Sequence, residues 1–250
     1  MSELLKGKVC IVTGAGRGIG RAIAELFAEN GAIVYANDAR EGCMEAWEVN
    51  DKGEFTGNIR ALYFDITDER QVKENILRIK KECGHIDVLV NNAGVEFNEL
   101  IGMISKKNME IMFKVNVFGT VNMLQMVSRV MGKQESGGSI INISSMTGLR
   151  GSRGQLVYSA TKGAVISLTK SAAKELAVKN IRVNSIAPGL TKTKMMEQAE
   201  QEKLKSRIEN VCMGRLAQPL DIANGCLLLA SDLAGYISGQ VLPVDGCTIM

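Results

Sequence analysis

Three polar residues in the middle of the chain have the types and the spacing needed to move a proton. Ser145 follows an apolar run, and Tyr158 and Lys162 stand four positions apart, which places both on one face of a helix. A free tyrosine has a pKa of about 10 and is a poor base at neutral pH, whereas a neighbouring ammonium favours the phenolate. We therefore expect Lys162 to lower the pKa of Tyr158, which would act as a general acid or base. Ser145 could hold a substrate oxygen beside the phenol.

A glycine-rich segment near the start of the chain could bind a phosphate group. Residues 13–20 follow an apolar run and precede a helical pattern, with glycine at positions 14, 18 and 20. Glycines let the chain turn tightly and let backbone N–H groups approach a pyrophosphate, and a helix N-terminus adds partial positive charge. The spacing is GxxxGxG, because the strict GxGxxG lacks its last glycine. After a strand and before a helix, this pattern predicts a dinucleotide site at Gly14, Gly18 and Gly20.

Acidic and basic residues near this segment bear on the choice of dinucleotide. Asp38 ends the second apolar run, where a carboxylate can accept hydrogen bonds from ribose hydroxyls and would repel a 2′-phosphate. This favours NAD, although Arg17 and Arg40 could each pair with a phosphate, so NADP stays open. Alternatively, Asp38 merely begins a turn. Asp65, which ends the third run, is placed to meet the adenine amino group, although it could instead cap the next helix.

The elements that must position these residues alternate regularly along the chain. Apolar runs occur at 9–13, 32–37, 61–65, 86–91, 139–144, 182–186 and 241–244, and helical patterns lie near 18–29, 68–82, 106–131, 155–178 and 219–230. The runs are continuous rather than alternating, which is typical of parallel strands covered on both faces. We predict one doubly wound, Rossmann-like α/β domain over residues 1–250, with about seven parallel strands.

One segment departs from this rhythm. Residues 190–214 are polar, rich in Lys and Glu, and helical in pattern, and they follow a Pro-Gly pair at a strand end. Ligands of such sheets bind beyond the carboxyl ends of the strands. We therefore predict a helical lid over the substrate, with a plain solvated helix as the alternative.

Composition excludes several other classes of protein. The 250 residues carry a net charge of +3 without a run of Lys or Arg, so we expect no nucleic-acid partner. The chain contains neither an apolar stretch long enough to cross a membrane nor the apolar core of a signal peptide. Six scattered cysteines and a single histidine predict free, mostly buried thiols and no metal site. Together these features predict a cytoplasmic protein.

The ordered set of motifs resembles the short-chain dehydrogenase/reductase superfamily over essentially the whole chain, from Lys8 to Met250. The set comprises the glycine segment, Asn91-Asn92-Ala93-Gly94, Ser145 with Tyr158 and Lys162, and Pro188-Gly189 followed by threonines. The resemblance implies an enzyme that transfers a hydride between a nicotinamide cofactor and a ketone or secondary alcohol, with Tyr158 as acid/base. A dinucleotide sensor without turnover is the alternative, but it would have no need of a proton relay.

The resemblance also assigns roles to single residues. Lys162 would bind the nicotinamide ribose as well as the phenol, and Asn116 would complete the catalytic set by holding a water that links Lys162 to solvent. The other cofactor contacts implied are Gly14, Arg17, Gly18, Ile19, Gly20, Asp38, Asp65, Ile66, Asn92, Ala93, Gly94, Tyr158, Pro188, Gly189, Thr191 and Thr193. The last strand, at 239–246, resembles one that packs across a tetramer interface.

The substrate stays open at this stage. Within the superfamily the chain resembles bacterial 3-oxoacyl-(acyl-carrier-protein) reductases and the related sugar, polyol and steroid dehydrogenases. Carrier-protein reductases usually take NADPH, which Asp38 disfavours, and they dock an acidic carrier protein on basic residues near the active-site mouth, where Lys133 and Lys179 could serve. A catabolic or secondary-metabolite dehydrogenase is an equal candidate. The predicted substrate pocket is partly apolar with one acid near it, and its candidates are Val95, Glu96, Met146, Thr147, Leu149, Leu190 and Met195.

The long helical patterns at 106–131 and 155–178 bear on assembly. Met123, Met126 and Val130 give the first of them more apolar surface than one sheet should need. Together with the apolar last strand, this predicts a homotetramer with dihedral symmetry.

Overall fold

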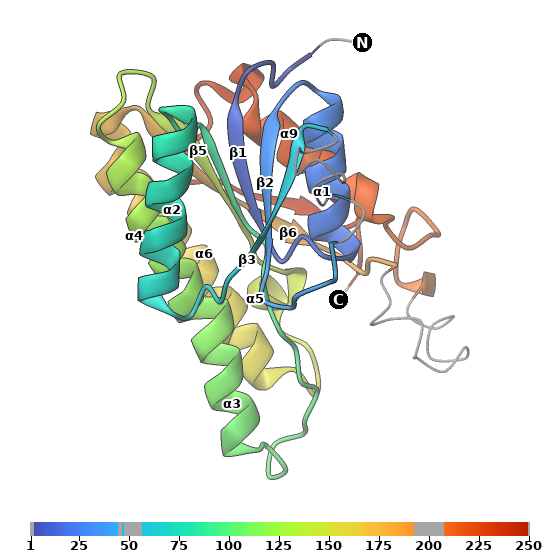
Figure 1. Ribbon diagram of the computed structural model, residues 1–250. Helices are drawn as coiled ribbons and strands as arrows, with labels where there is room; N and C mark the ends of the chain where they lie inside the picture. Colours follow the sequence, from blue (N-terminus) through green and yellow to red (C-terminus); the bar gives the residue numbers. More distant parts are fainter. Residues whose placement is uncertain (1–2, 45–46, 48–56, 193–207, 250) are drawn as a thin grey trace.

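Seven parallel strands form one sheet in the computed structural model, which describes residues 3–44, 47, 57–192 and 208–249. The sheet order is β3-β2-β1-β4-β5-β6-β7, and every neighbouring pair is parallel (Figure 1). The strands are β1 (Val9–Thr13), β2 (Ile33–Asp38), β3 (Ile59–Tyr63), β4 (Val88–Asn91), β5 (Gly138–Ile143), β6 (Ile181–Pro188) and β7 (Val241–Val244). The order reverses between β1 and β4, and ligands bind at the carboxyl ends of the strands beside such a switch point.

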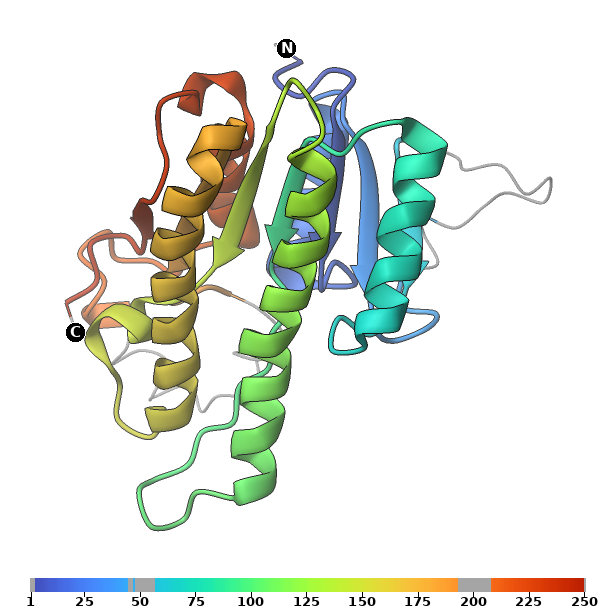
Figure 2. The same ribbon diagram turned by 90° about the vertical axis from the view of Figure 1, so that its left-hand side faces the viewer.

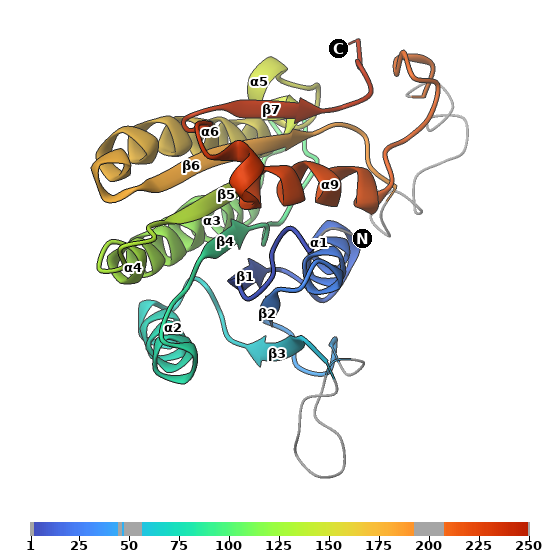
Figure 3. The same cartoon turned by 90° about the horizontal axis from the view of Figure 1, so that it is seen from above.

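Helices cover both faces of the sheet, α1 and α9 on one and α2, α4 and α6 on the other (Figure 3). The helices are α1 (Gly18–Glu29), α2 (Glu69–Cys83), α3 (Lys106–Phe113), the π-helix η2 (Lys114–Gly119), α4 (Thr120–Met131), α5 (Met146–Arg150), α6 (Leu156–Leu176), η3 (Ala177–Lys179), α9 (Pro219–Ala230) and η4 (Asp232–Ala234). This architecture confirms the predicted doubly wound α/β class.

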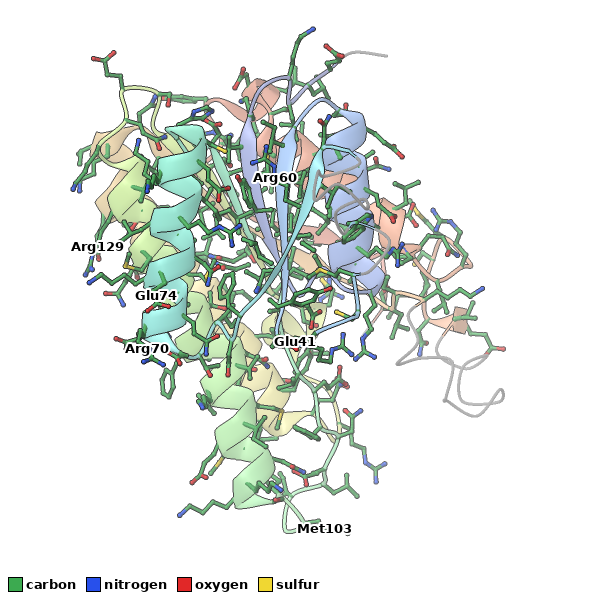
Figure 4. All side chains as sticks on the ribbon, in the orientation of Figure 1. Glu41, Arg60, Arg70, Glu74, Met103 and Arg129 are labelled. Carbon is green, nitrogen blue, oxygen red and sulfur yellow. The ribbon has the colours of Figure 1, made fainter. Side chains whose placement is uncertain are left out.

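Two long helical columns extend past the carboxyl edge of the sheet. Helix α3, η2 and α4 run on without a break and lie beside α6, as Figure 2 shows. The loop before α3 forms the far tip, where Met103 is exposed (Figure 4). The columns thus project side chains into the space where the loops after β4 and β5 leave the sheet.

Polar residues set the ends of α2. The Asp68 carboxylate accepts hydrogen bonds from the backbone N–H groups of Arg70 and Gln71, and Gly84 ends the helix in the left-handed conformation. Asp65 therefore does not cap this helix, contrary to the alternative that the sequence left open. The third strand also ends at Tyr63, two residues before Asp65, and not at Asp65 as predicted.

The core consists of two layers, one on each side of the sheet. Phe27 of α1 is fully buried on one side, and Met123 of α4 is fully buried on the other. Burying a side chain of this size contributes about 1.5–3 kcal/mol to stability. Met123 and Val130 are thus covered by their own chain, whereas Met126 is only partly buried, which corrects the tetramer argument for the first two residues.

Two further features concern thiols and membranes. All six cysteines are free, but only Cys10 and Cys226 are buried, so the expectation of mostly buried thiols is wrong. In the described ranges, no helix has the length and apolar character that crossing a bilayer requires.

Candidate active site

The glycine loop between β1 and α1 has a conformation that depends on two glycines. Gly14 has φ +64°, which L side chains rarely adopt. A Cβ atom on Gly20 would lie 2.3 Å from the Gly14 carbonyl oxygen and 2.4 Å from Nδ2 of Asn92. The N-terminal turn of α1 can therefore pack directly against the loop, which leaves room for a phosphate group at its backbone.

The stretch after β4 is fixed to this loop by hydrogen bonds. Nδ2 of Asn92 donates to the carbonyl oxygens of Thr13 (2.9 Å) and Gly14 (3.1 Å). In return, Oγ1 of Thr13 accepts from the backbone N–H groups of Asn92 and Ala93, each at 3.0 Å. Thr13 was not predicted as a site residue, although its place at the end of β1 was. These bonds join the two loops on either side of the switch point.

Asp38 at the end of β2 presents an ionised carboxylate to the glycine loop. One oxygen accepts from the backbone N–H of Gly16 (3.2 Å), and the other accepts from the backbone N–H (3.1 Å) and Nε (3.2 Å) of Arg40. Burial acts to raise the pKa of Asp38, but the hydrogen bonds and charge of Arg40 outweigh it and hold the pKa below its ordinary value. Asp38 thus shapes a turn and also keeps its charge at the loop.

The other residues predicted at the adenosine end make less direct contributions. Oδ1 of Asp65 accepts from the backbone N–H of Thr67 at 2.8 Å, and Ile66 is buried. Arg17 occupies the N-cap position of α1 and is exposed. The structure therefore places Arg17 next to the helix N-terminus that a phosphate would approach.

The predicted proton-transfer residues come together at the carboxyl ends of β5 and β6. Ser145 caps α5, and its Oγ accepts from the backbone N–H of Thr147 at 3.2 Å. Tyr158 and Lys162 lie on α6, with Nζ of Lys162 5.7 Å from the centre of the Tyr158 ring. Lys162 is buried, and its Nζ donates to the carbonyl oxygen of Ile143 at 2.8 Å.

Burial dominates the electrostatics of this group. It lowers the pKa of Lys162 to about 8, with the charge of Glu96 opposing the shift. Burial also raises the pKa of Tyr158 above its ordinary value. The charge of Glu96 adds to this rise, and a hydrogen bond with Ser145 reduces it. The expectation that Lys162 lowers the pKa of Tyr158 is therefore wrong, because the ammonium points at the Ile143 carbonyl and is itself destabilised by burial.

Asn116 lies in the π-helix η2, a feature often found at functional sites. Its Oδ1 accepts from the backbone N–H of Val95 (2.8 Å), and its Nδ2 donates to the Val95 carbonyl (2.9 Å) and to Oγ1 of Thr161 (3.0 Å). A Cβ on Gly94 would lie 3.3 Å from Oδ1 of Asn116 and 3.4 Å from Nζ of Lys162. Asn116 thus holds the loop after β4 close to the ammonium.

A cavity of about 510 Å³ opens over these residues. The predicted residues that line it are Ile19, Asn92, Gly94, Val95, Glu96, Ser145, Thr147, Tyr158, Lys162, Pro188, Gly189, Leu190 and Thr191. Those that the structure places outside its lining are Gly14, Arg17, Gly18, Gly20, Asp38, Asp65, Ile66, Ala93, Asn116, Met146 and Leu149. Met146 is buried and Leu149 is exposed, which corrects their assignment to the pocket. Thr193, Met195 and most of the predicted lid lie outside the described residues.

Several lining residues were missed by the sequence analysis. They include Arg153 and Gln155 from the loop before α6, Asn210, and Thr248 and Ile249 near the chain end. No motif marks them, because they reach the cavity through loops whose paths depend on the folded chain. The Arg150 guanidinium donates to the Thr248 carbonyl oxygen at 2.9 Å, which brings the chain end to the cavity.

Lys133 and Lys179 do not lie near this cavity. Lys133 precedes β5 and Lys179 precedes β6, so both stand at the amino ends of strands whose carboxyl ends carry the site. Their assignment as a dock at the active-site mouth is therefore wrong. The exposed basic side chain among the described residues that line the cavity is Arg153.

Comparison with known proteins decides the family. Residues 14–247 match the family model described as enoyl-(acyl carrier protein) reductase. The chain is 40% identical to a 3-oxoacyl-[acyl-carrier-protein] reductase of Thermotoga maritima, over 97% of this chain and 98% of that protein. It is 39% identical to a 3alpha-hydroxysteroid dehydrogenase of Mediterraneibacter gnavus, over 98% of both chains. The chain belongs to the short-chain dehydrogenase/reductase family.

Membership of the short-chain dehydrogenase/reductase family makes the protein an NAD(P)-dependent oxidoreductase that acts on CH–OH groups. The relatives are named reductases and dehydrogenases, which leaves the sensor alternative without support. The residues present fit a nicotinamide cofactor. The Gly14–Gly20 contact forms a cradle that a Cβ would fill, and the cavity runs from Ile19 at the loop to Tyr158 and Lys162.

Proposed function

We propose that Tyr158 is the acid/base of a ketone/secondary-alcohol oxidoreductase, with Ser145 orienting the substrate oxygen. The observation that carries the proposal is the convergence of Ser145, Tyr158 and Lys162 on one cavity next to the glycine loop. A nicotinamide cofactor, when bound, supplies or accepts the hydride. The raised pKa of Tyr158 keeps its phenol protonated at neutral pH, so it can donate a proton to the oxygen of a ketone as that oxygen becomes an alkoxide.

Lys162 has two roles in this proposal. Its ammonium would hold the nicotinamide ribose, and with a pKa of about 8 it can also gain and lose a proton near neutral pH. Asn116 supports it from the π-helix, because the amide fixes the loop that covers the ammonium. A chain of proton donors from Lys162 toward solvent through a water near Asn116 belongs to the same proposal.

The proposed cofactor is NAD in preference to NADP. The ionised carboxylate of Asp38 accepts from the backbone N–H of Gly16, so its charge stands at the loop that would receive the adenosine ribose. Arg40 is already paired with Asp38 and is therefore less free to bind a 2′-phosphate. The remaining contacts proposed for the cofactor are those that the sequence analysis named.

We propose the predicted homotetramer through the same two helical columns and the last strand, but with other residues at the contacts. Met109, Phe118 and Leu156 are exposed on the two helical columns, and Leu242 is exposed on the edge strand β7. Apolar groups on helix and edge strand would be covered by second copies of the chain. Light scattering should give about four times the chain mass of 27.0 kDa, and a mass of one chain at micromolar concentration would contradict the assembly.

Reduction of a 3-oxoacyl group on an acyl carrier protein is the second candidate. It is favoured by relatives of that name in Thermotoga maritima and Vibrio harveyi, the latter 39% identical over 97% of both chains. Leu190 and Thr191, at the described start of the segment 190–214, line the cavity and would contact either substrate.

Turnover tests separate the two candidates. Ketones, secondary alcohols and 3-oxoacyl thioesters, free and on a carrier protein, are each assayed with NAD(H) and NADP(H). We expect faster turnover of a small ketone/alcohol pair with NAD(H). If only carrier-bound thioesters react, the second candidate replaces the first, and if no compound reacts, both are wrong.

A further inference from the structure

An acidic side chain stands in the cavity close to the proposed acid/base. Glu96 follows β4 and is the one acid among the described residues that line the cavity. Its charge raises the pKa of both Tyr158 and Lys162, which places it within electrostatic reach of the reacting group. Glu96 was among the candidates for the predicted substrate pocket.

The loop that carries Glu96 is fixed to the opposite wall. Nε2 of Gln155 donates to Oε1 of Glu96, and the backbone N–H of Glu99 donates to the Gly154 carbonyl oxygen at 2.8 Å. Glu99 also pairs with Gln155 in a parallel bridge. Glu96 is therefore held in place before any substrate arrives.

Glu96 and its neighbour Glu99 differ in what their carboxylates bind. Both oxygens of Glu99 are used within the fold, one by the backbone N–H of Ser105 (3.2 Å) and the other by Nδ2 of Asn108 (2.8 Å). In the ranges that the structure describes, Oε2 of Glu96 has neither a hydrogen-bond nor an ion-pair partner, and the atom is not fully buried. A half-buried carboxylate oxygen in this position is an acceptor ready for a ligand donor.

The charges around the cavity limit the kind of donor that fits. Arg153 and Lys162 also line it, so an ammonium group on the substrate would meet two like charges. A neutral hydroxyl meets no such repulsion and forms a charge-assisted hydrogen bond with Oε2. The methylene chain of an acyl thioester would instead leave that oxygen without a partner and without water.

We propose that Glu96 binds a second hydroxyl group of the substrate, so that the preferred substrates are polyols and hydroxyketones with a hydroxyl next to or near the reacting carbon. This inference rests on the proposed function of the same cavity. A site whose acceptor bonds a substrate hydroxyl discriminates against the analogue that lacks it, because the analogue displaces water from the acceptor and leaves it unpaired.

Matched substrates that differ by one hydroxyl test the proposal. Butane-2,3-diol and butan-2-ol are compared as substrates with NAD, together with larger polyols and their deoxy analogues. For wild type we expect kcat/KM to favour the hydroxylated member of a pair by about tenfold or more, the effect of one charge-assisted hydrogen bond. Glu96→Gln should reduce that preference by about tenfold, mainly through KM. Because the variant also removes a charge that acts on Tyr158 and Lys162, the readout is the ratio of kcat/KM between the two members of a pair, measured at the same pH.

Controls separate this idea from the function on which it rests. Glu110→Gln alters an exposed acid on α3 and should change neither substrate. Tyr158→Phe should abolish turnover of both members of a pair. Equal effects of Glu96→Gln on diol and deoxy substrate, or a wild-type preference for the deoxy member or for acyl thioesters, would overturn the proposal.

A binding measurement tests the hydroxyl site even if the enzyme turns over none of these substrates. Calorimetry with the enzyme preloaded with NADH measures the affinity for butane-2,3-diol and larger polyols directly. We expect the affinity to fall about tenfold in Glu96→Gln and to be unchanged in Glu110→Gln. If wild type turns over nothing yet binds polyols through Glu96, the proposed acid/base fails and the hydroxyl site stands; equal affinities in wild type and Glu96→Gln refute the hydroxyl site.

Discussion

The two halves of the sheet supply different kinds of groups to the site. On the β1–β2 side, contacts to a ligand are left mainly to backbone groups and glycines. The charged side chains beside them are the buried Asp38, which is paired with Arg40, and the exposed Arg17. On the β4–β5–β6 side, the groups are buried side chains that are already bonded within the fold, such as Asn116 and Lys162. Asn142 extends this buried polar layer by donating to Oγ1 of Thr169 at 2.9 Å.

This difference teaches how each half should respond to substitution. Substitutions in the glycine loop can be accommodated by small shifts of the backbone. Changes there should therefore alter cofactor affinity, and the preference for NAD over NADP, in a graded way. A buried polar group has no water to replace a lost partner, so changes there should alter turnover and stability sharply. The predictions that follow test this contrast, beginning with the largest expected effect.

Tyr158→Phe should separate binding from turnover. The variant removes one hydroxyl and leaves the ring to pack, so affinity for NAD(H) should barely change. Turnover should fall by about 10²–10⁴-fold, as is typical when a general acid is lost. Cofactor fluorescence titration and steady-state kinetics measure the two quantities. Wild-type rates in this variant, on a substrate that the native enzyme accepts, would show that the acid/base assignment is wrong.

Lys162→Met should remove activity and yet stabilise the folded protein at pH 7. Burial lowers the pKa of Lys162 from 10.5 to about 8, and a shift of that size corresponds to about 3 kcal/mol of destabilisation while the group is charged. The expected gain in free energy of unfolding is up to about 3 kcal/mol, less the hydrogen bond lost at the Ile143 carbonyl. Denaturant unfolding measures it, with the exposed Lys170→Met on the same helix as control.

The lowered pKa of Lys162 also predicts the direction in which the free energy of unfolding changes with pH. Because the folded state binds the Lys162 proton less tightly than the unfolded chain does, wild-type stability rises with pH between about 8 and 10.5. The advantage of Lys162→Met should therefore be full below pH 8 and shrink across that window. Destabilisation of the variant at pH 7, with Lys170→Met unchanged, would contradict the cost ascribed to the buried ammonium.

The same contrast explains how much of the molecule could be read from the sequence. Helices at 18–29 and 219–230 and strands at 9–13 and 241–244 were predicted with the bounds observed, because apolar periodicity and glycine or proline mark their ends. The π-helix in 106–131 was not, because it depends on how Asn116 reaches Val95 across the fold. The pKa of Tyr158 was predicted in the wrong direction, because burial is not visible in residue spacing.

Gly20→Ala should damage the cofactor half without touching the catalytic residues. The added Cβ would stand 2.3 Å from the Gly14 carbonyl oxygen, so the loop or the Asn92 amide must shift. Overpacking of this kind costs about 1–3 kcal/mol. We expect lower stability and weaker NAD(H) affinity, measured by unfolding and fluorescence titration. Gly57→Ala, where a Cβ meets nothing within 4 Å, is the control, and equal behaviour of the two variants would show that the close packing at Gly20 does not matter.

Asp38→Asn should have the smallest effect, on cofactor preference alone. Two like charges about 4 Å apart at an effective dielectric of about 20 repel by about 4 kcal/mol, and the Arg40 guanidinium cancels much of that repulsion. We therefore expect the ratio of kcat/KM for NAD over NADP to fall about tenfold in Asp38→Asn, which is about 1.4 kcal/mol.

Arg40→Gln sharpens the same prediction, because it frees the Asp38 carboxylate from its ion pair and removes the cation that a 2′-phosphate could use. The preference for NAD should then widen, so the two neighbouring substitutions act in opposite directions. Glu41→Gln removes an exposed charge from the same loop (Figure 4) and should leave the ratio near its wild-type value, since water screens an exposed charge. Equal or better kcat/KM with NADPH in wild type would refute the role given to Asp38. A shift in Glu41→Gln as large as that in Asp38→Asn would instead assign the preference to the net charge of the loop.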